Sequence, residues 1–271
     1  MDRPLVLCDL DGVVWRGPDV IPGAVDALLE LTRSGCDIVF ITNNSNRPVA
    51  DYEGRLESLG VEATGRVATS ALAAASLVGQ VDRTMVCAGP GVVDALERSG
   101  RLWESAGLHP DECDGPIGAV IVGLHHDFDY RRLSNASAAV RGGARLIGTN
   151  TDATFPTRGG EEPGGGSLLA AVATAAGAVP VIAGKPHRPM VDLALAMAPG
   201  PVSPERAIVI GDRASTDGEF ARALGLPFAY VSGGVAGDRP SERPRVEGAT
   251  LEVILPDLRS LLVGDAPGRP R

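Results

Sequence analysis

The first 45 residues of the chain contain a strand, a helix and a second strand in close succession. PLVLCDL (residues 4–10) is a short apolar run, PGAVDALLELTRSG (22–35) opens with a proline and ends with a glycine, and CDIVFITNN (36–44) is apolar almost throughout. The helix carries apolar residues on about one face, and the second strand is typical of one that is covered on both sides. This βαβ unit predicts a parallel sheet.

The alternation of strands and helices continues along the chain, with later apolar runs such as TMVCAGP, AVIVGL, VPVIAG and RAIVIGD. It predicts an α/β fold with a Rossmann-like parallel core, and 271 residues suffice for two domains. The interval between ITNNS and GKP is too long for one crossover helix and contains its own strands and helices. We therefore expect an inserted α/β domain over residues 80–179, and a core domain made of residues 1–79 and 180–271.

Polar residues gather where the predicted strands end. Because an unpaired buried charge costs several kcal/mol, the first strand should stop where two carboxylates emerge from it. In open parallel sheets, ligands bind beyond the carboxyl ends of the strands. The polar residues at these ends are Asp9 and Asp11, then Thr42, Asn43, Asn44 and Ser45, then Lys185, and finally Asp212 with Asp217 a turn later. Alone, the acidic residues, Thr42 and Asn43 could cap a turn or a helix, and Lys185 could be a surface lysine, but together they predict one site.

The charges of these residues indicate what the site would hold. Carboxylates that meet repel each other and raise each other's pKa unless a cation lies among them, and hard oxygen ligands favour Mg²⁺. Lys185 adds a second positive charge, while Thr42 and the amides after it add hydrogen-bond donors. Such a pocket suits a dianionic tetrahedral group beside the metal, most simply a phosphoryl group.

The composition restricts the kinds of molecule that the protein is expected to bind and the compartment in which it is expected to lie. Lys and Arg number 25 against 34 Asp and Glu, a formal charge of -9, so we expect no broad basic face for nucleic acid or anionic membrane. The four cysteines form no CxxC pair, and we find neither a signal-peptide pattern nor an apolar run of membrane-spanning length. We expect a soluble, cytoplasmic protein whose partners are small molecules or protein.

Four segments together resemble a known superfamily. DLDGVVW, ITNNS, GKP and GDRASTD occur in that order and are spread over most of the chain, and the set is similar to the haloacid dehalogenase (HAD) superfamily of aspartate-dependent phosphotransferases. TNTDATFP, followed by PGGGSLLAAVATAAG and GKP, resembles subfamily IIA. That subgroup includes p-nitrophenyl phosphatases, glycerol 3-phosphate and phosphoglycolate phosphatases, and NagD-type nucleotidases. DxD alone would be weak, whereas the set is specific.

The resemblance implies a role for each carboxylate. Asp9 would attack phosphorus to form an aspartyl-phosphate, and Asp11 would protonate the leaving alkoxide and then deprotonate the attacking water. Mg²⁺ would bind the Asp9 carboxylate, the Asp11 backbone carbonyl and Asp212.

The resemblance also implies how the phosphoryl group is held. Thr42 and Asn43 would hydrogen-bond the phosphoryl oxygens, and Lys185 would neutralise charge on Asp9 and on the transferring group. Asp217 would support the metal site from outside the first set of ligands.

The resemblance further implies that the inserted domain is a C2-type cap, which roofs the crevice, excludes water and selects the leaving group. The Gly-rich segment 149–167 is expected to be a loop suited to the entrance, although its RGGEEPGG part could equally be a flexible surface loop. His125 occupies a position where related sequences usually have Asp. With His126 it could bind a metal, but adjacent histidines are more typical of a loop. Homodimerisation, common in related proteins, is a further possibility.

These residues favour a Mg²⁺-dependent phosphatase of a small phosphomonoester, with glycerol 3-phosphate or 2-phosphoglycolate preferred. The low aromatic content, 4%, argues against stacking of a large base. A nucleoside monophosphate or pyridoxal phosphate phosphatase is the enzymatic alternative. A non-catalytic phospholigand-binding protein of the same fold is a second class, which the presence of Asp9, Asp11 and Lys185 disfavours.

Overall fold

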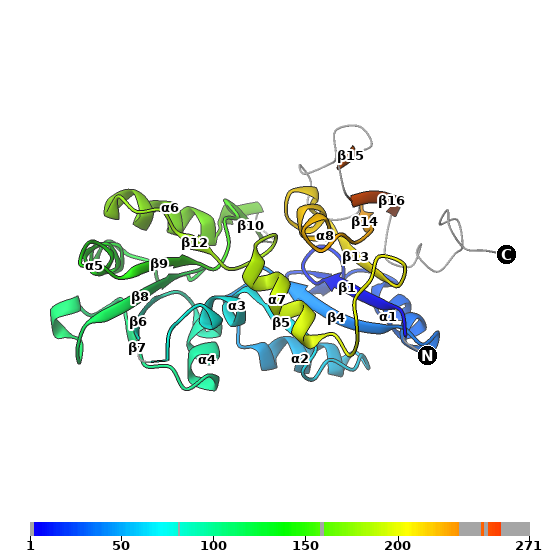
Figure 1. Ribbon diagram of the computed structural model, residues 1–271, viewed down its shortest axis with the longest axis horizontal. Helices are drawn as coiled ribbons and strands as arrows, with labels where there is room; N and C mark the ends of the chain where they lie inside the picture. Colours follow the sequence, from blue (N-terminus) through cyan, green and yellow to red (C-terminus); the bar gives the residue numbers. More distant parts are fainter. Residues whose placement is uncertain (1–2, 81, 158–159, 233–244, 247–248, 256–271) are drawn as a thin grey trace. The chain divides into compact units, whose positions relative to one another are not determined.

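The structure is a computed structural model of the chain, and it describes residues 3–80, 82–157, 160–232, 245–246 and 249–255. The chain forms two compact units. The first contains the residues up to Thr42, Glu53–Ala68 and the residues from Lys185 onward. The second contains Asn43–Tyr52 and Thr69–Gly184. Each unit is built on its own sheet (Figure 1).

The first unit contains a seven-stranded sheet. Its strands, in spatial order, are β15 (Arg245–Val246), β16 (Ala249–Leu255), β14 (Phe228–Val231), β13 (Ala207–Gly211), β1 (Leu5–Asp9), β4 (Asp37–Thr42) and β5 (Val67–Thr69). β1 pairs in parallel with both β4 and β13, and β14 pairs in parallel with β13 and β16. From β1 the chain adds strands first on the β4 side and later on the β13 side, so the strand order reverses at β1. Ligand sites of open α/β sheets lie at this kind of position.

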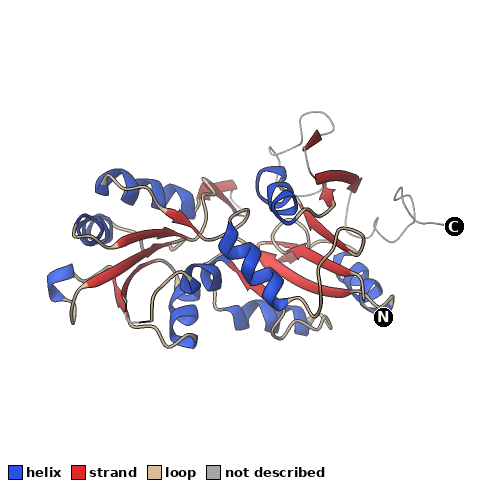
Figure 2. Ribbon diagram, in the orientation of Figure 1, coloured by secondary structure: helices blue, strands red, loops and turns tan. Residues whose placement is uncertain are grey.

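Helices complete this unit (Figure 2), together with a small hairpin. The elements are the hairpin β2 (Trp15–Arg16) and β3 (Asp19–Val20), α1 (Ala24–Arg33), α2 (Val49–Ser58, which continues from the second unit), α7 (Arg188–Met197), a π-helical turn η2 (Ala214–Gly218) and α8 (Glu219–Leu224). α1 buries Ala24, Ala27, Leu28 and Leu31, the spacing expected of one apolar helix face. The predicted α/β fold with a parallel core is confirmed.

The second unit contains a five-stranded sheet in which all neighbours are parallel. The strands, in spatial order, are β12 (Val181–Ile182), β9 (Arg145–Gly148), β8 (Ile117–Val122), β6 (Arg83–Cys87) and β7 (Trp103–Ser105). Its helices are α3 (Ser70–Ser76), α4 (Pro90–Arg98), a short 3₁₀ turn η1 (Pro110–Glu112), α5 (Tyr130–Arg141) and α6 (Gly165–Ala176).

The core of the second unit lies between its sheet and the helices α5 and α6, which pack against each other and against β8. Alternate residues of neighbouring strands supply one side of the core: Met85 and Cys87, Val120 and Val122, and Leu146. Ala136, Ala139, Leu169 and Val172 supply the helical side. This second hydrophobic core gives the unit a source of stability of its own.

The segment 149–167 differs from its expected form as a loop. It contains a β-hairpin, in which β10 (Thr154–Thr157) pairs antiparallel with β11 (Gly160–Pro163). The expectation of an irregular loop is wrong there, because Thr154, Phe155 and Thr157 favour extended structure and find a partner strand a few residues later. The glycines after β11 instead let two backbone segments lie close together. A Cβ at Gly166 would lie 2.3 Å from the backbone carbonyl carbon of Thr151.

Two further features bear on the sequence-based expectations. None of the helices in the described ranges is both long enough and apolar enough to span a bilayer. The four cysteines form no disulfide. The boundaries of an inserted domain at residues 80 and 179 stay a prediction.

Candidate functional site

Strand register brings three of the predicted site residues to one edge of the seven-stranded sheet. β1 is paired with β13 so that Cys8 faces Ile210, and with β4 so that Asp9 faces Ile41. Asp9 therefore ends β1 at the level where Thr42 ends β4 and where Asp212 follows β13. All three side chains are buried, with exposed fractions of 5% or less.

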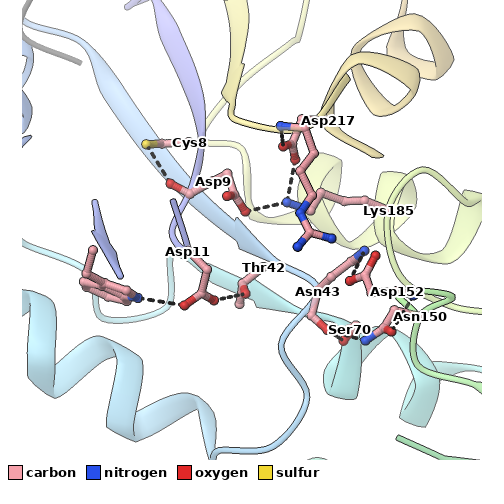
Figure 3. A network of polar contacts seen from close by, with 12 residues as sticks. Cys8, Asp9, Asp11, Thr42, Asn43, Ser70, Asn150, Asp152, Lys185 and Asp217 are labelled. Atoms are coloured by element: carbon pink, nitrogen blue, oxygen red, sulfur yellow. Dashed lines mark hydrogen bonds and ion pairs between the residues drawn. The ribbon is translucent and has the colours of Figure 1, made fainter. Parts of the chain in front are cut away.

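Lys185 joins this edge and forms two short ion pairs. Its Nζ lies 2.5 Å from Asp9 Oδ1 and 2.6 Å from Asp217 Oδ1 (Figure 3). Lys185 and Asp217 are as deeply buried as Asp9. A buried ammonium between two buried carboxylates is stable only as a set, because removing one partner leaves a charge in a poorly solvated place.

The π-helical turn η2 orients Asp217 toward the sheet. The Asp217 amide donates to the carbonyl of Arg213, and the Arg213 amide donates to Asp217 Oδ2 at 3.1 Å. These two bonds hold the carboxylate close to the end of β13 while Oδ1 accepts from Lys185. Asp217 is thus part of the charged cluster, and Lys185 is the residue that it contacts there.

Burial and neighbouring charges set the protonation of the cluster. Burial raises the pKa of the Asp9 carboxyl well above its usual range; Lys185 opposes this shift, while Asp217 and Asp212 reinforce it. For Lys185, burial acts to lower the pKa, but Asp217 and Asp9 outweigh burial, and the pKa is raised. Lys185 therefore stays an ammonium, and Asp9 needs positive charge beyond that of Lys185 to be ionised.

The donor set fits a hard divalent cation. Oxygens of Asp9, Asp212 and Asp217 lie within 4.8 Å of one another, and all three residues are buried. The ligand atoms are carboxylate oxygens, which Mg²⁺ prefers over nitrogen or sulfur donors. Among the residues that the structure describes, this is the group of acidic, histidine or cysteine side chains that could hold a metal.

Gly12 allows Asp212 to reach this position. Gly12 has a φ of 96°, and a Cβ at this residue would lie 2.0 Å from Asp212 Oδ2. A side chain at position 12 would therefore displace the carboxylate and strain the backbone at once. The glycine of DLDGVVW is required by the packing of Asp212, not only by the turn.

Gly12→Ala is expected to lower the free energy of unfolding by about 1–3 kcal/mol more than Gly17→Ala does. Gly17 also has a positive φ, 53°, but a Cβ there would meet nothing within 4 Å, so this control carries the backbone cost without the clash. Urea unfolding of both variants measures the difference. Equal losses of stability would show that Asp212 moves aside at no cost.

Asp11 occupies a neighbouring position with different contacts. Its Oδ1 accepts a hydrogen bond from the indole Nε1 of Trp15 at 3.1 Å, and its Oδ2 accepts one from the Thr42 hydroxyl at 3.2 Å. Asp11 is only partly buried. The two carboxylates of the DxD segment thus differ in environment: Asp9 lies in the buried charged cluster, and Asp11 is held by neutral donors.

Asn43 belongs to the second unit, although it directly follows Thr42. Its carbonyl accepts hydrogen bonds from the Ser70 hydroxyl and from Asn150 Nδ2, at 2.6 Å and 2.8 Å. Its own side-chain amide lies 3.5 Å from Asp152 Oδ2. Figure 3 shows these residues, and the bonds fix the backbone of Asn43 where the chain leaves β4.

His125 is buried in the second unit, and burial lowers its pKa. Its Nδ1 lies 2.9 Å from the Gly123 carbonyl oxygen, and its ring meets Phe128 edge to face. Within the described ranges, neither His125 nor His126 belongs to a group of side chains that could bind a metal. His125 thus lies buried in the loop that follows β8, and this agrees with the loop position expected for adjacent histidines.

Three residues that contact the predicted site residues were not predicted from the sequence. Trp15 lies in the segment DLDGVVW, yet its hydrogen bond to Asp11 was not expected. Its spacing, four residues after Asp11 across a glycine turn, was a usable signal. Ser70 and Asn150, which bind the Asn43 carbonyl, come from distant segments and have no local signal.

Two family profiles match the chain. Residues 6–101 match the family described as haloacid dehalogenase-like hydrolase, and residues 182–261 match one described as HAD-hydrolase-like. The matched segments contain Asp9, Asp11 and Thr42 in the first case, and Lys185, Asp212 and Asp217 in the second.

Similar proteins cover nearly the whole chain. The D-glycerol 3-phosphate phosphatase of Mycobacterium tuberculosis is 36% identical over 98% of this chain and 75% of its own length. The human glycerol-3-phosphate phosphatase is 32% identical over 87% of this chain and 80% of its own. A crystal structure of the M. tuberculosis glycerol phosphate phosphatase in complex with magnesium has a TM-score of 0.80 at 31% identity, over 96% of this chain and 76% of that one. With these relatives and with the site described above, the chain belongs to the haloacid dehalogenase-like hydrolase family.

Proposed function

We propose that this protein is a Mg²⁺-dependent phosphatase that hydrolyses a small phosphomonoester through an aspartyl-phosphate at Asp9. The observation that carries the proposal is the buried cluster in which Lys185 lies within 2.6 Å of both Asp9 and Asp217, beside Asp212. A buried nucleophile with a fixed ammonium and a set of hard ligands provides what phosphoryl transfer needs, namely positioning and charge neutralisation. The relatives named as glycerol 3-phosphate phosphatases support glycerol 3-phosphate as the first candidate substrate, with 2-phosphoglycolate beside it.

The site would hold the metal through three groups: the carboxylates of Asp9 and Asp212 and the backbone carbonyl of Asp11. A related enzyme has been crystallised with magnesium, which supports this choice of ion. When bound, Mg²⁺ lowers the pKa of the Asp9 carboxyl and offsets negative charge on the phosphoryl group.

In the first step, an Asp9 oxygen attacks phosphorus while the bond from phosphorus to the ester oxygen breaks. Asp11 gives its proton to the leaving alkoxide, so an alcohol departs. Lys185 stabilises charge on Asp9 and on the transferring group, and Thr42 and Asn43 donate hydrogen bonds to the phosphoryl oxygens.

In the second step, Asp11 acts as the base. It takes a proton from a water molecule, the water oxygen attacks phosphorus, and the bond between phosphorus and Asp9 breaks. Inorganic phosphate leaves, Asp9 is a carboxylate again and Asp11 is protonated again. Asp217 holds Lys185 in place during both steps through its 2.6 Å ion pair.

The inserted segment 80–179 is proposed to act as a cap that excludes water and selects the leaving group. The segment contains the strands β6, β7, β8 and β9 of the five-stranded sheet and most of the second hydrophobic core, which supports a separable domain. The proposal includes a cytoplasmic location, which the absence of disulfides supports. Homodimerisation stays a prediction that sedimentation of the purified protein tests.

A substrate panel tests this function. Purified protein with Mg²⁺ is assayed against glycerol 3-phosphate, 2-phosphoglycolate, nucleoside monophosphates and pyridoxal phosphate, and kcat/KM is compared. We expect the highest kcat/KM with the small polyol or hydroxy-acid phosphates. A preference for nucleotides or pyridoxal phosphate would favour the alternative phosphatase, and binding without turnover would favour a phospholigand-binding protein.

Asp212→Asn is expected to raise the Mg²⁺ concentration needed for half-maximal activity by at least about 10-fold, because an amide is a weaker and uncharged ligand. High Mg²⁺ should recover part of the rate, since Asp9 remains able to attack. The measurement is a Mg²⁺ titration of the initial rate. Asp192→Asn, which weakens an exposed ion pair with Arg188 on α7, is the matched control. If saturating Mg²⁺ restores nothing, Asp212 has a different role.

A further inference from the structure

Trp15 contacts Asp11 from the hairpin that follows the DxD segment. The indole is buried, with 1% of its surface exposed, and its Nε1 donates to Asp11 Oδ1 at 3.1 Å. The backbone reinforces this arrangement, since the Gly12 amide donates to the Trp15 carbonyl at 2.7 Å and the Trp15 amide donates to the Leu10 carbonyl at 3.2 Å. The turn at Gly12 thus returns the chain so that residue 15 lies beside residue 11.

Arg55 fixes the indole ring from its other side. The Arg55 guanidinium carbon lies 4.0 Å from the centre of the Trp15 ring, within the range of a cation–π contact. Two guanidinium nitrogens also donate to the carbonyls of Gly17 and Pro18, each at 2.9 Å, in the turn of the same hairpin. Arg55 on α2 therefore holds both the ring and the turn that carries it.

Trp15 and Thr42 are not equivalent as donors to Asp11. Thr42 donates its hydroxyl proton to Asp11 Oδ2 at 3.2 Å, but a hydroxyl has a single proton to donate. When that proton goes to a phosphoryl oxygen, as the proposed function requires, Oδ2 loses this donor. The indole N–H has no such second task, because the ring is buried beneath Arg55.

We propose that Trp15 is a positioning residue for Asp11, which holds Oδ1 throughout the reaction so that Oδ2 is the oxygen that transfers the proton. The inference rests on the proposed function, in which Asp11 is the acid and base. In the first step the bond between Oδ2 and its proton breaks as the proton binds the leaving oxygen, and in the second step Oδ2 receives a proton from water. Trp15 contacts neither substrate nor phosphorus.

Trp15→Phe tests this role, because it keeps an aromatic ring and removes the N–H donor. We expect kcat with glycerol 3-phosphate to fall about 10- to 100-fold, the range for loss of a hydrogen bond to a charged group, with little change in KM. The first step, measured in a single turnover, should slow less with p-nitrophenyl phosphate, whose leaving group needs little protonation. In an Asp11→Asn background the same substitution should add almost nothing.

The chain provides a matched control in its second tryptophan. Trp103 Nε1 donates to Glu97 Oε1 at 3.2 Å in the second unit, so Trp103→Phe removes the same kind of bond without touching Asp11. Because Trp15→Phe also leaves a cavity, a second protein carries 3-benzothienylalanine at position 15, in which sulfur replaces the N–H at nearly constant volume. We expect this replacement to reproduce the loss of kcat, while Trp103→Phe leaves kcat unchanged.

The hydrogen bond itself is measured without turnover. In ¹⁵N-labelled protein without Mg²⁺ or substrate, the indole resonance that disappears in Trp15→Phe belongs to Trp15, and it should move upfield in Asp11→Ala. Glu97→Ala should move only the Trp103 resonance.

The outcomes separate the two proposals. A wild-type protein inactive on the whole substrate panel would refute the proposed function. If the wild type is active, three results would overturn the positioning role alone. They are an unchanged kcat in both position-15 replacements, an equal slowing of aryl and alkyl substrates, and a Trp15 resonance that does not move in Asp11→Ala.

Discussion

Asp9→Asn is expected to abolish turnover with every phosphomonoester, with kcat lowered by at least about 10⁴-fold, the scale seen when a covalent nucleophile is removed. An amide keeps the size of the carboxylate and can still accept a hydrogen bond from Lys185, which lies 2.5 Å from Asp9. It cannot attack phosphorus, so no covalent intermediate should form. Steady-state assays with an alkyl and an aryl phosphate measure the loss.

Asp26→Asn, at an exposed position on α1, is the matched control and should retain the wild-type rate. Substantial turnover in Asp9→Asn, or a phosphorylated enzyme trapped from it, would show that the nucleophile is another residue.

Removal of Mg²⁺ is expected to abolish activity as completely as Asp9→Asn does. Asp9, Asp212 and Asp217 bring three carboxylates within 4.8 Å of one another around one ammonium, and a phosphate dianion would add two further negative charges. The measurement is the initial rate after dialysis against EDTA, followed by titration with MgCl₂. We expect a rate at background without metal and full recovery with it.

The melting temperature provides a readout that does not depend on turnover. Because Mg²⁺ should bind the folded state in preference to the unfolded state, added MgCl₂ should raise the Tm of the wild type, and raise it less in Asp212→Asn. Full turnover in excess EDTA would contradict the proposed metal requirement.

The fold and the charged cluster could be predicted from the sequence because one geometric rule connects them. Apolar runs indicate parallel strands, and the carboxyl ends of parallel strands meet at one edge. Asp9, Thr42 and Asp212 are therefore brought together by strand order and register alone. Lys185 and Asp217 lie at the same edge of the sheet. The sequence places a positive and a negative charge there, and these two charges form an ion pair.

Contacts that depend on tertiary detail could not be predicted in this way. The hydrogen bond from Trp15 to Asp11 requires the turn at Gly12, which the spacing of the segment indicates, but also the packing of Arg55 on the ring, which has no local signal. The pairing of β10 with β11 was not predicted, because the glycines and charged residues of this segment are typical of loops. Asn43 adjoins Thr42 in sequence, yet its backbone is fixed by Ser70 and Asn150 from remote segments.

The most direct test is to locate the covalent intermediate in the wild-type enzyme. The protein is mixed with substrate and Mg²⁺, quenched in acid during turnover and treated with borohydride, which reduces an aspartyl-phosphate to homoserine. Peptide mass spectrometry then identifies the modified position. We expect homoserine at position 9 and at no other aspartate. Homoserine at Asp11, Asp212 or Asp217, or none at all while substrate is being hydrolysed, would contradict the mechanism.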